Sequence, residues 1–484
     1  MVASLGGRFR RGLLLSLLNT VLARAATFAM GIVLARFLSP EQYGMFATAL
    51  TMQMFLLVVN DLGVGAALVR SDRPVQEMLP TCWTLSVGGG LVCTLAAVAG
   101  SGVMASALGS PNATGILQLM SLNILINGFV SVPASLLKRN FEQGKRLIAD
   151  LVGLTVNISL TLSLVAAGFG AWSLAIGHVT GAALVGVLIM VATRCWPRFG
   201  FDRGYGRQVA QLGLAMAGAA VLLICLQAAP QAITGHLLGP TAIGFFFIAS
   251  NVANWPIQIV STTVERVALA TFAQARTDGR SLEETASAVI GLVVGIVLIS
   301  GTALAVLAHP IIGVVYGRPW LPAASMLAGL ALANVARVLA ELVFNLLVAA
   351  DSMLTSMLPQ AAWLAVLVPA SILGGRLWGM PGIGWAQAAV GFAWAVPVNL
   401  WCARKAGVGV RSLLRGLGGP VRVTLVLAVV LVGLSEVSPH DLVTLAVGLP
   451  VAGAAVLFTY RNIRGTLSFG QATQGSTAPT EVTT

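Results

Sequence analysis

The chain consists of apolar segments that are too long and too numerous for a water-soluble core. A helix needs about 20 predominantly apolar residues to cross the hydrocarbon of a bilayer. Hydrophobic residues make up 57% of the 484 positions and charged residues only 9%, whereas soluble domains carry roughly 25% charged residues. In lipid each segment has to satisfy its own backbone hydrogen bonds, as a helix does. We therefore expect an all-α polytopic membrane protein.

About 14 such segments follow one another, separated by glycine, proline and charged residues. Helix limits taken from a sequence are soft by several residues. The expected transmembrane helices span residues 12 to 36, 42 to 68, 77 to 107, 113 to 136, 147 to 168, 171 to 193, 208 to 237, 241 to 273, 284 to 308, 321 to 350, 353 to 374, 382 to 402, 421 to 437 and 441 to 459.

Basic residues fall on alternate connections between these segments. With the N-terminus in the cytoplasm, 22 of the 28 Lys and Arg residues lie on the cytoplasmic side, which is a strong positive-inside signature. We therefore expect both termini in the cytoplasm. The net charge of +12 then follows from topology and from attraction to anionic membrane lipids. No nucleic-acid partner is expected, because the basic residues lie in seven separate stretches without interleaved aromatic residues.

One pattern occurs twice, at a spacing of 200 residues, and each copy joins one apolar segment to the next. Loops rich in glycine and proline can resemble each other by composition alone, but several matches at one spacing favour an internal duplication. The first copy comprises Leu38, Pro40, Gly44 and Phe46, and the second comprises Leu238, Pro240, Gly244 and Phe246.

Six predicted helices separate the two copies, so both copies enter the membrane in the same direction. Halves of this kind are related by a pseudo-twofold axis along the membrane normal and enclose a cavity, as in transporters. The tail is rich in Gln, Thr, Ser, Pro and Gly, which cannot build a core. We expect an N-lobe of six helices (1–200), a C-lobe of six helices (201–405), two C-terminal helices (406–464) and a disordered cytoplasmic tail (465–484).

Several local motifs point to a family. LARFLSPEQYG at 34–44 and DLGVGAAL at 61–68 are followed by Phe169 to Leu174, Asn254-Trp255-Pro256 and Trp320 to Ala324. In this order they resemble the polysaccharide transport branch of the multidrug/oligosaccharidyl-lipid/polysaccharide exporter superfamily, the Wzx-type flippases. One departure concerns helix seven, where many relatives carry an Asn or Asp and this chain has Ala228-Ala229-Pro230-Gln231.

The resemblance implies a function and partners. Wzx-type proteins move undecaprenyl-diphosphate-linked oligosaccharide units from the cytoplasmic to the outer leaflet of the bacterial inner membrane. A polysaccharide polymerase and chain-length or export proteins then use these units. The products are exopolysaccharide, capsule or O-antigen. By this resemblance the chain is a multi-pass inner-membrane flippase that works by alternating access, with no catalytic residue and no cofactor.

Such a substrate needs a polar cavity with cations, because sugar hydroxyls are costly to place in hydrocarbon and a diphosphate is held best by arginine. Arg24 lies in the middle of the first span, where a charge is expensive, so we expect it in the cavity rather than at an interface. Arg337 and Glu341 lie one turn apart and form either a structural pair or a substrate contact. Arg266 is either a contact at the cytoplasmic mouth or a positive-inside anchor.

Uncharged and acidic residues complete the expected site. Asn60 and Asp61 either bind a coupling cation or a sugar hydroxyl, or cap a helix end. Gln227 and Gln231 are expected to line the cavity. Pro230, and Pro256 in the next span, are expected hinges or gates, since proline bends a helix. His178 and His236 are either proton carriers or, more often for such residues, structural.

Other functions are weaker readings of the chain. No P-loop or zinc motif is present in the sequence, so we expect neither ATP hydrolysis nor a metal site. Within transporters the alternatives are a multidrug or cation antiporter, which would carry acidic cavity residues, and a lipid II flippase. A membrane polysaccharide polymerase or ligase would need a large outer loop for its catalytic residues, and the longest outer connections here are short. A scaffolding protein would not need Arg24 inside the membrane.

Overall fold

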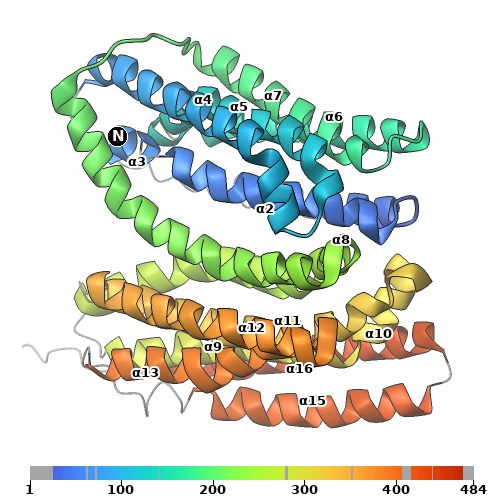
Figure 1. The fold of residues 1–484 in the computed structure, drawn as a ribbon. Helices are drawn as coiled ribbons and strands as arrows, with labels where there is room; N and C mark the ends of the chain where they lie inside the picture. The colour runs from blue at the N-terminus through green and yellow to red at the C-terminus, as the bar shows by residue number, and fades with distance from the viewer. Residues whose placement is uncertain are drawn as a thin grey trace, which may run out of the picture. The chain divides into compact units, whose positions relative to one another are not determined.

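A computed structural model describes residues 26–61, 64–70, 74–140, 142–277, 282–349, 353–405, 416–438 and 440–472. The chain divides into two compact units, Met1–Phe247 and Ile248–Thr484, and each is treated by itself. Within the described ranges every regular element is a helix (Figure 1). Ten helices there are long and apolar enough to cross a membrane, or 11 if a bent pair counts as one span. The predicted all-α membrane fold is confirmed.

Two of the long helices each contain two of the predicted spans. Helix α8 (Arg203–Thr277) holds the seventh and eighth and is broken only at Gly239, with φ 82° and ψ −178°. Helix α12 (Met353–Val390) is broken in the same way at Gly379, with φ 63° and ψ −140°. Positive φ of this kind is open to glycine and strained for other residues. The sequence placed the breaks correctly, between residues 237 and 241 and between 374 and 382.

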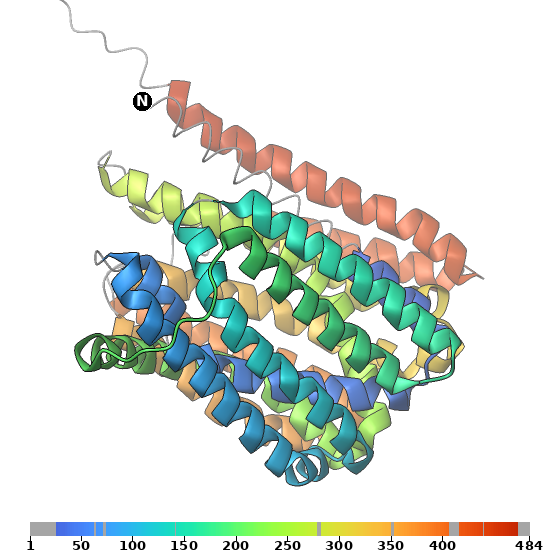
Figure 2. The same cartoon turned by 90° about the horizontal axis from the view of Figure 1, so that it is seen from above.

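The first unit is a helical bundle followed by the start of α8. Helix α4 packs on α5, α5 on α7 and α2, and α6 on α7, as Figure 2 shows for the antiparallel pair α6 and α7. Small residues let α6 and α7 approach, because a Cβ at Gly153 would come within 3.0 Å of the Gly181 carbonyl oxygen. The elements are α2 (Pro40–Asp61), α3 (Val64–Arg70), α4 (Val75–Ala107), η1 (Pro111–Ala113), α5 (Thr114–Arg139), α6 (Gln143–Ala166) and α7 (Ala171–Thr193).

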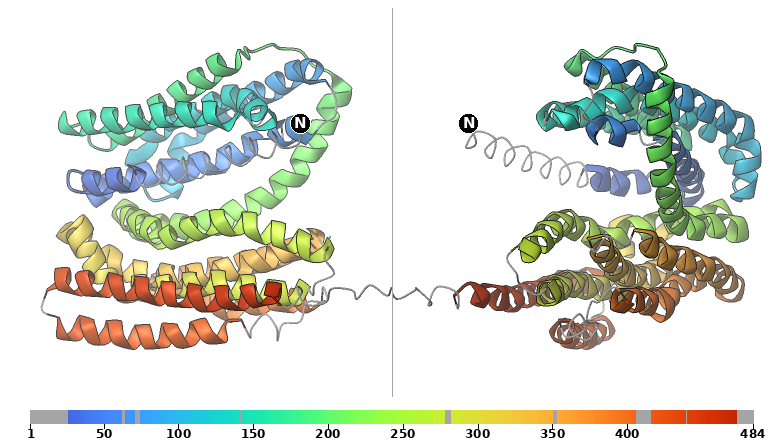
Figure 3. Two further views of the ribbon diagram at one scale, coloured as in Figure 1. Left: turned by 180° about the vertical axis from the view of Figure 1, so that it is seen from behind. Right: turned by 90° about the vertical axis from the view of Figure 1, so that its left-hand side faces the viewer.

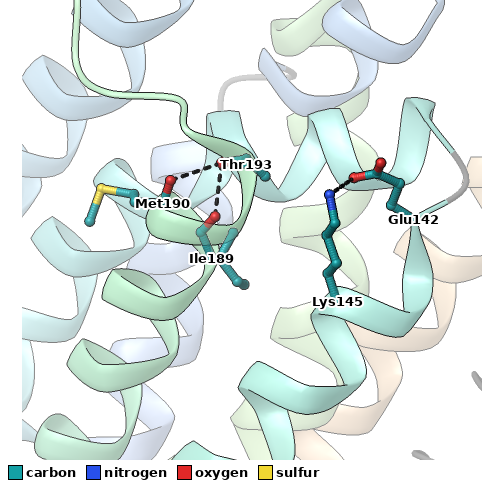
Figure 4. A network of polar contacts seen from close by, with 5 residues as sticks. All are labelled: Glu142, Lys145, Ile189, Met190 and Thr193. Atoms are coloured by element: carbon teal, nitrogen blue, oxygen red, sulfur yellow. Dashed lines mark hydrogen bonds and ion pairs between the residues drawn. The ribbon is translucent and has the colours of Figure 1, made fainter.

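The basic connections of this unit meet at one end of the bundle. Arg139 at the end of α5 donates to the Leu68 carbonyl at 2.7 Å. The segment after α7 is tied to α4, where the Gly200 amide donates to Thr84 Oγ1 at 3.1 Å and the Asp202 amide to Thr81 Oγ1 at 2.9 Å. Figure 4 shows the start of α6 and the end of α7 close together at this end. This clustering is what the alternating charge pattern predicts.

The two copies of the repeated motif contact each other at another end of the same unit. A Cβ added at Gly44 would overlap the Pro240 carbonyl oxygen and lie 3.2 Å from the Gly244 amide nitrogen. A Cβ added at Gly244 would in turn overlap the Pro40 carbonyl oxygen and lie 3.2 Å from the Gly44 amide nitrogen. Such a reciprocal exchange of partners is what a local twofold relation produces, so the structure supports the duplication inferred from the sequence.

The second unit, which also contains the end of α8, is built around α9. This helix packs against α11, α15 and α16, and its valines face a buried cluster that includes Val335 and Leu339 of α11. Figure 3 shows α15 and α16 running side by side. The further elements are α9 (Leu282–Val306), α10 (Ala308–Ile311), η2 (Ile312–Tyr316), η3 (Arg318–Trp320), α11 (Pro322–Ala349), η4 (Gly391–Ala395), α13 (Val396–Lys405), α15 (Gly418–Val437) and α16 (Asp441–Ala472).

Candidate functional site

The predicted site residues are distributed over both units. Arg24 lies outside the described residues, and so do the side chains of Asp61 and Arg266, although both residues belong to described helices. The first unit holds Asn60, Gln227, Pro230 and Gln231, and the second unit holds Pro256, Arg337 and Glu341. Within each unit the structure adds polar partners that the sequence did not single out.

Arg337 is held by amides inside the second unit. Its guanidinium Nη2 donates to Asn254 Oδ1 at 3.1 Å, which joins α11 to the later part of α8. Asn334, one turn earlier on α11, donates to the same Oδ1 at 3.3 Å and to the Ala253 carbonyl at 2.9 Å. Two helices are thus bridged by three hydrogen bonds around one cation.

Glu341 is the acidic residue predicted to pair with Arg337. The carboxylate lies one turn after Arg337 on α11 and is close enough to exert an electrostatic effect on the guanidinium. A guanidinium has five N–H donors in a planar fork. Because Arg337 gives a single hydrogen bond to the side chains described here, the fork retains donors for a ligand with two adjacent oxygens, such as a phosphate.

A related polar bridge lies in the first unit. Asn123 Nδ2 of α5 donates to Gln53 Oε1 of α2 at 3.2 Å, and Gln53 Nε2 lies 3.3 Å from Nε2 of His178 on α7. The ring of Phe46 meets the His178 ring edge-on, with centroids 6.3 Å apart. Both amides are buried, with Gln53 8% and Asn123 4% exposed. The bridge therefore joins three helices around one imidazole.

The two bridges occupy corresponding places in the duplication. Gln53 lies 13 residues after Pro40, and Ala253 lies 13 residues after Pro240. In both units an Asn two predicted spans further on, Asn123 or Asn334, donates to this place. The first copy adds His178 and the second adds Arg337. Sequence reasoning found the histidine and the arginine but missed the four amides, of which only Gln53 stands at a position that the spacing from the repeated prolines relates to the other bridge.

The proline-containing turn of α8 contacts α2. Gln231 Nε2 donates to the Ala47 carbonyl at 3.3 Å. Within α8, the Thr234 hydroxyl donates to the Pro230 carbonyl at 2.7 Å. Gln227 is exposed. Inside α8, Gly239 is the residue whose backbone angles are not helical, so Pro230 and Pro256 both keep helical angles. Their part as hinges stays a prediction.

Two further predicted residues have contrasting surroundings. Asn60 is 1% exposed, and neither atom of its amide has a hydrogen-bond partner within the described part of the chain. His236 is exposed and its Nδ1 lies 3.2 Å from the Ala107 carbonyl oxygen, which ties the end of the first half of α8 to the end of α4. A buried amide without a partner is costly, so Asn60 is the stronger ligand candidate.

Comparison with known proteins identifies relatives in polysaccharide synthesis. A family described as "Polysaccharide biosynthesis protein" matches residues 33–325. The succinoglycan biosynthesis transport protein ExoT of Rhizobium meliloti is 28% identical over 65% of this chain and 65% of its own length. The lipopolysaccharide biosynthesis protein WzxC of Escherichia coli is 23% identical over 72% of each chain. The match thus spans just under two thirds of ExoT's length.

Solved structures share the fold at low sequence identity. The lipid II flippase MurJ, in an inward closed conformation, has a TM-score of 0.76 at 14% identity and covers 93% of this chain and 99% of its own. An inward-facing MATE family transporter of the MOP superfamily has a TM-score of 0.65 at 14% identity, over 80% of this chain and 94% of its own. Since the family match covers well over half of the 484 residues, the chain belongs to the polysaccharide biosynthesis protein family, within the polysaccharide transport branch that its motifs resemble.

Proposed function

We propose that the protein is a flippase of the bacterial inner membrane that moves a polyprenyl-diphosphate-linked oligosaccharide from the cytoplasmic to the outer leaflet. The observation that carries this proposal is Arg337, a cation inside an apolar helix that is held by Asn254 and retains donors for a diphosphate. A charge at such a depth is expensive and in membrane proteins marks a substrate or ion path. Family membership supplies the polysaccharide context.

The proposed division of labour follows the chemistry of the substrate. Arg337 contacts the diphosphate, because its planar fork matches two phosphate oxygens. Arg24 and Arg266 are assigned to the same task at other depths. Buried amides such as Asn60 would form hydrogen bonds with sugar hydroxyls. Moving one hydroxyl from water to hydrocarbon without a partner costs about 4 to 8 kcal/mol of free energy. The lobes at 1–200 and 201–405 would alternate access to this site.

The proposed direction is outward and needs no nucleotide. A diphosphate lipid carries negative charge, and an inside-negative potential favours its exit by about 2.3 kcal/mol per elementary charge per 100 mV. The basic connections that meet at one end of the first unit would face the cytoplasm, with both termini on that side. A polymerase and chain-length or export proteins would take over the lipid-linked unit at the outer leaflet.

The test measures which leaflet holds the lipid-linked oligosaccharide. The gene is deleted and replaced by plasmid copies of the wild type, Arg337→Gln, Arg337→Lys and Arg24→Ala, and spheroplasts are probed for the oligosaccharide at their outer face. We expect cytoplasmic accumulation in the deletion, rescue by the wild type, and at least tenfold less outer-leaflet arrival with Arg337→Gln. Arg337→Lys should rescue only partly, because an ammonium lacks the bidentate fork.

A matched control separates substrate contact from bulk charge. Arg422→Gln removes an exposed arginine of α15 whose Nε donates to the Gly418 carbonyl of the same helix, at 3.1 Å, and it should rescue fully. Immunoblots of membranes check that all variants reach equal amounts. Normal arrival at the outer face in the deletion strain, without polymer, would overturn the proposal and favour a polymerase or ligase. Efflux of small cations instead of oligosaccharide would favour an antiporter.

A further inference from the structure

His178 of α7 lies at the end of a short hydrogen-bond chain. Gln53 connects it to Asn123, with 3.3 Å between the Nε2 atoms of Gln53 and His178 and 3.2 Å between Asn123 Nδ2 and Gln53 Oε1. The direction of the chain fixes the histidine tautomer. Since Gln53 Oε1 accepts from Asn123, the Gln53 amide donates to His178, and His178 Nε2 is an acceptor with its ring proton on Nδ1.

The far end of the chain contains an unused acceptor. Asn123 Oδ1 is buried and has no hydrogen-bond partner in the described ranges, although the residue is only 4% exposed. A buried acceptor without a donor costs free energy. The chain as it stands is therefore one of two possible arrangements, and it leaves this atom unsatisfied.

A proton on His178 would favour the other arrangement. The proton binds the lone pair of Nε2, which becomes a donor, so Gln53 has to turn its Oε1 toward the ring. The Nε2 amide of Gln53 then points at Asn123 and donates to Oδ1 once that amide has turned as well. Both hydrogen bonds of the chain are kept and their direction reverses, while Asn123 Nδ2 takes the place of Oδ1 as the amide atom without a partner among the described residues.

The electrostatic surroundings make the charged form depend on water. Among the described residues, His178 has a hydrogen bond with Gln53 and a ring contact with Phe46, both of α2, and neither partner carries a charge. Helices α2, α5 and α6 pack against α7 or its partner helices, and α7 itself has no acidic or basic residue besides His178. The charged residues of the others lie at or near their ends, namely Glu41, Asp61, Lys138, Arg139, Lys145, Arg146 and Asp150.

An imidazolium without a counter-charge is stable only where water reaches it. His178 is partly exposed, not fully buried, so it can exchange a proton when its surroundings are wet. If apolar helices closed over His178, its imidazole would have to be neutral, so the proton would have to leave before the closure. Protonation would thereby be linked to a conformational step.

We propose that His178, Gln53 and Asn123 form a proton-binding site whose hydrogen-bond chain reverses when the proton binds. The use of that proton to drive export rests on the proposed function. The site itself does not, because it follows from the geometry of three side chains within one unit.

The first test reads the position of the ring proton directly. His236, His309 and His440 are replaced by Gln, which leaves His178 as the one histidine of the full chain. The protein is labelled with nitrogen-15 histidine in lipid nanodiscs and followed by NMR from pH 5 to 9. At alkaline pH we expect the Nδ1–H tautomer as the major form, and Gln53→Leu should abolish that preference.

A carboxylate at the far end gives the decisive comparison. Asn123→Asp can only accept, so Gln53 must donate to it and present Oε1 to the ring, and the major alkaline form should become the Nε2–H tautomer. Asn123→Leu, which cannot accept, should not produce this switch. An Nε2–H tautomer already dominant in the parent protein, or an unchanged tautomer in Asn123→Asp, would overturn the proposal.

The second test addresses transport separately. Spheroplasts that carry wild type or His178→Gln are treated with nigericin, which removes the pH gradient, and outer-leaflet oligosaccharide is measured. We expect a severalfold fall in the wild type and no further fall in His178→Gln. An equal fall in both would overturn the coupling while leaving the tautomer result standing. If no oligosaccharide is flipped at all, the proposed function fails, and the NMR result still decides the site.

Discussion

Within each unit, individual amide side chains connect neighbouring helices. The sequence did not single out these amides. Arg337 could be predicted because a charge in an apolar span is rare and expensive. Asn254 and Asn334 gave no such signal, because an uncharged amide is cheap enough to occur in a membrane helix for many reasons. Their role depends on which residues of α8 and α11 face each other, and the periodicity of one helix does not contain that information.

A substitution at Asn334 should measure the strength of this bridge. Asn334→Ala removes the two hydrogen bonds that this side chain gives to α8 and should lower the free energy of unfolding by about 1 kcal/mol, the usual scale for interhelical bonds in membranes. Ser325→Ala removes an exposed hydroxyl that bonds within its own helix end, at 2.9 Å to Pro322, and should change little. Reversible unfolding in mixed detergent micelles would measure both. Equal effects would mean that the bridge adds no stability.

Helix breaks are set by glycine at the scale of single elements. The sequence predicted hinges at Pro230 and Pro256, yet the backbone of α8 leaves helical angles only at Gly239, and that of α12 only at Gly379. A proline loses one backbone hydrogen bond and can remain in a membrane helix where neighbouring groups compensate for the loss, and α8 keeps helical angles at Pro230. A sharp change of direction needs φ angles that glycine adopts most easily.

The contact between the repeated turns predicts a specific sensitivity to alanine. Gly44→Ala would place a Cβ on the Pro240 carbonyl oxygen, so the two turns must separate. We expect a loss of thermal stability of the purified protein and reduced export. Gly31→Ala is the matched control, since a Cβ there meets nothing within 4 Å, and an alanine in a helix is more stable than a glycine by up to about 1 kcal/mol.

A double substitution tests whether both glycines serve one contact. Gly244→Ala alone should resemble Gly44→Ala, because its Cβ would fall on the Pro40 carbonyl oxygen. Once one alanine has separated the turns, the second should cost much less than it does alone. Additive losses of stability would show that the two glycines act independently.

For the whole molecule, the sequence predicted more than it did for any site. The helix order, the breaks near residues 239 and 379 and the duplication all follow from apolar length and spacing, and the structure agrees with them. Cavity residues could not be assigned in this way, because apolar length and spacing do not say which faces of two helices meet. Arg24 and the side chains of Asp61 and Arg266 lie outside the described residues. The roles of these three residues stay predictions.

Membrane orientation gives a test at this scale. Alkaline phosphatase fused after residue 110 or 169 should be active, because these turns lie on connections expected outside the cytoplasm. Fusions after residue 141 or 198, on the basic connections, should be inactive. Fluorescent-protein fusions at the same four points should show the opposite pattern. Reversed activity would place the basic end outside and contradict the proposed direction of export.

The reciprocal contact of Gly44 and Gly244 also bears on how the chain has diverged since its duplication. The two turns contact each other directly, so a larger residue in place of either glycine would displace both turns. Elsewhere the two copies differ, with His178 at one polar bridge and Arg337 at the other. The few residues that still match across 200 positions include those through which the two ancestral halves constrain each other's mutations.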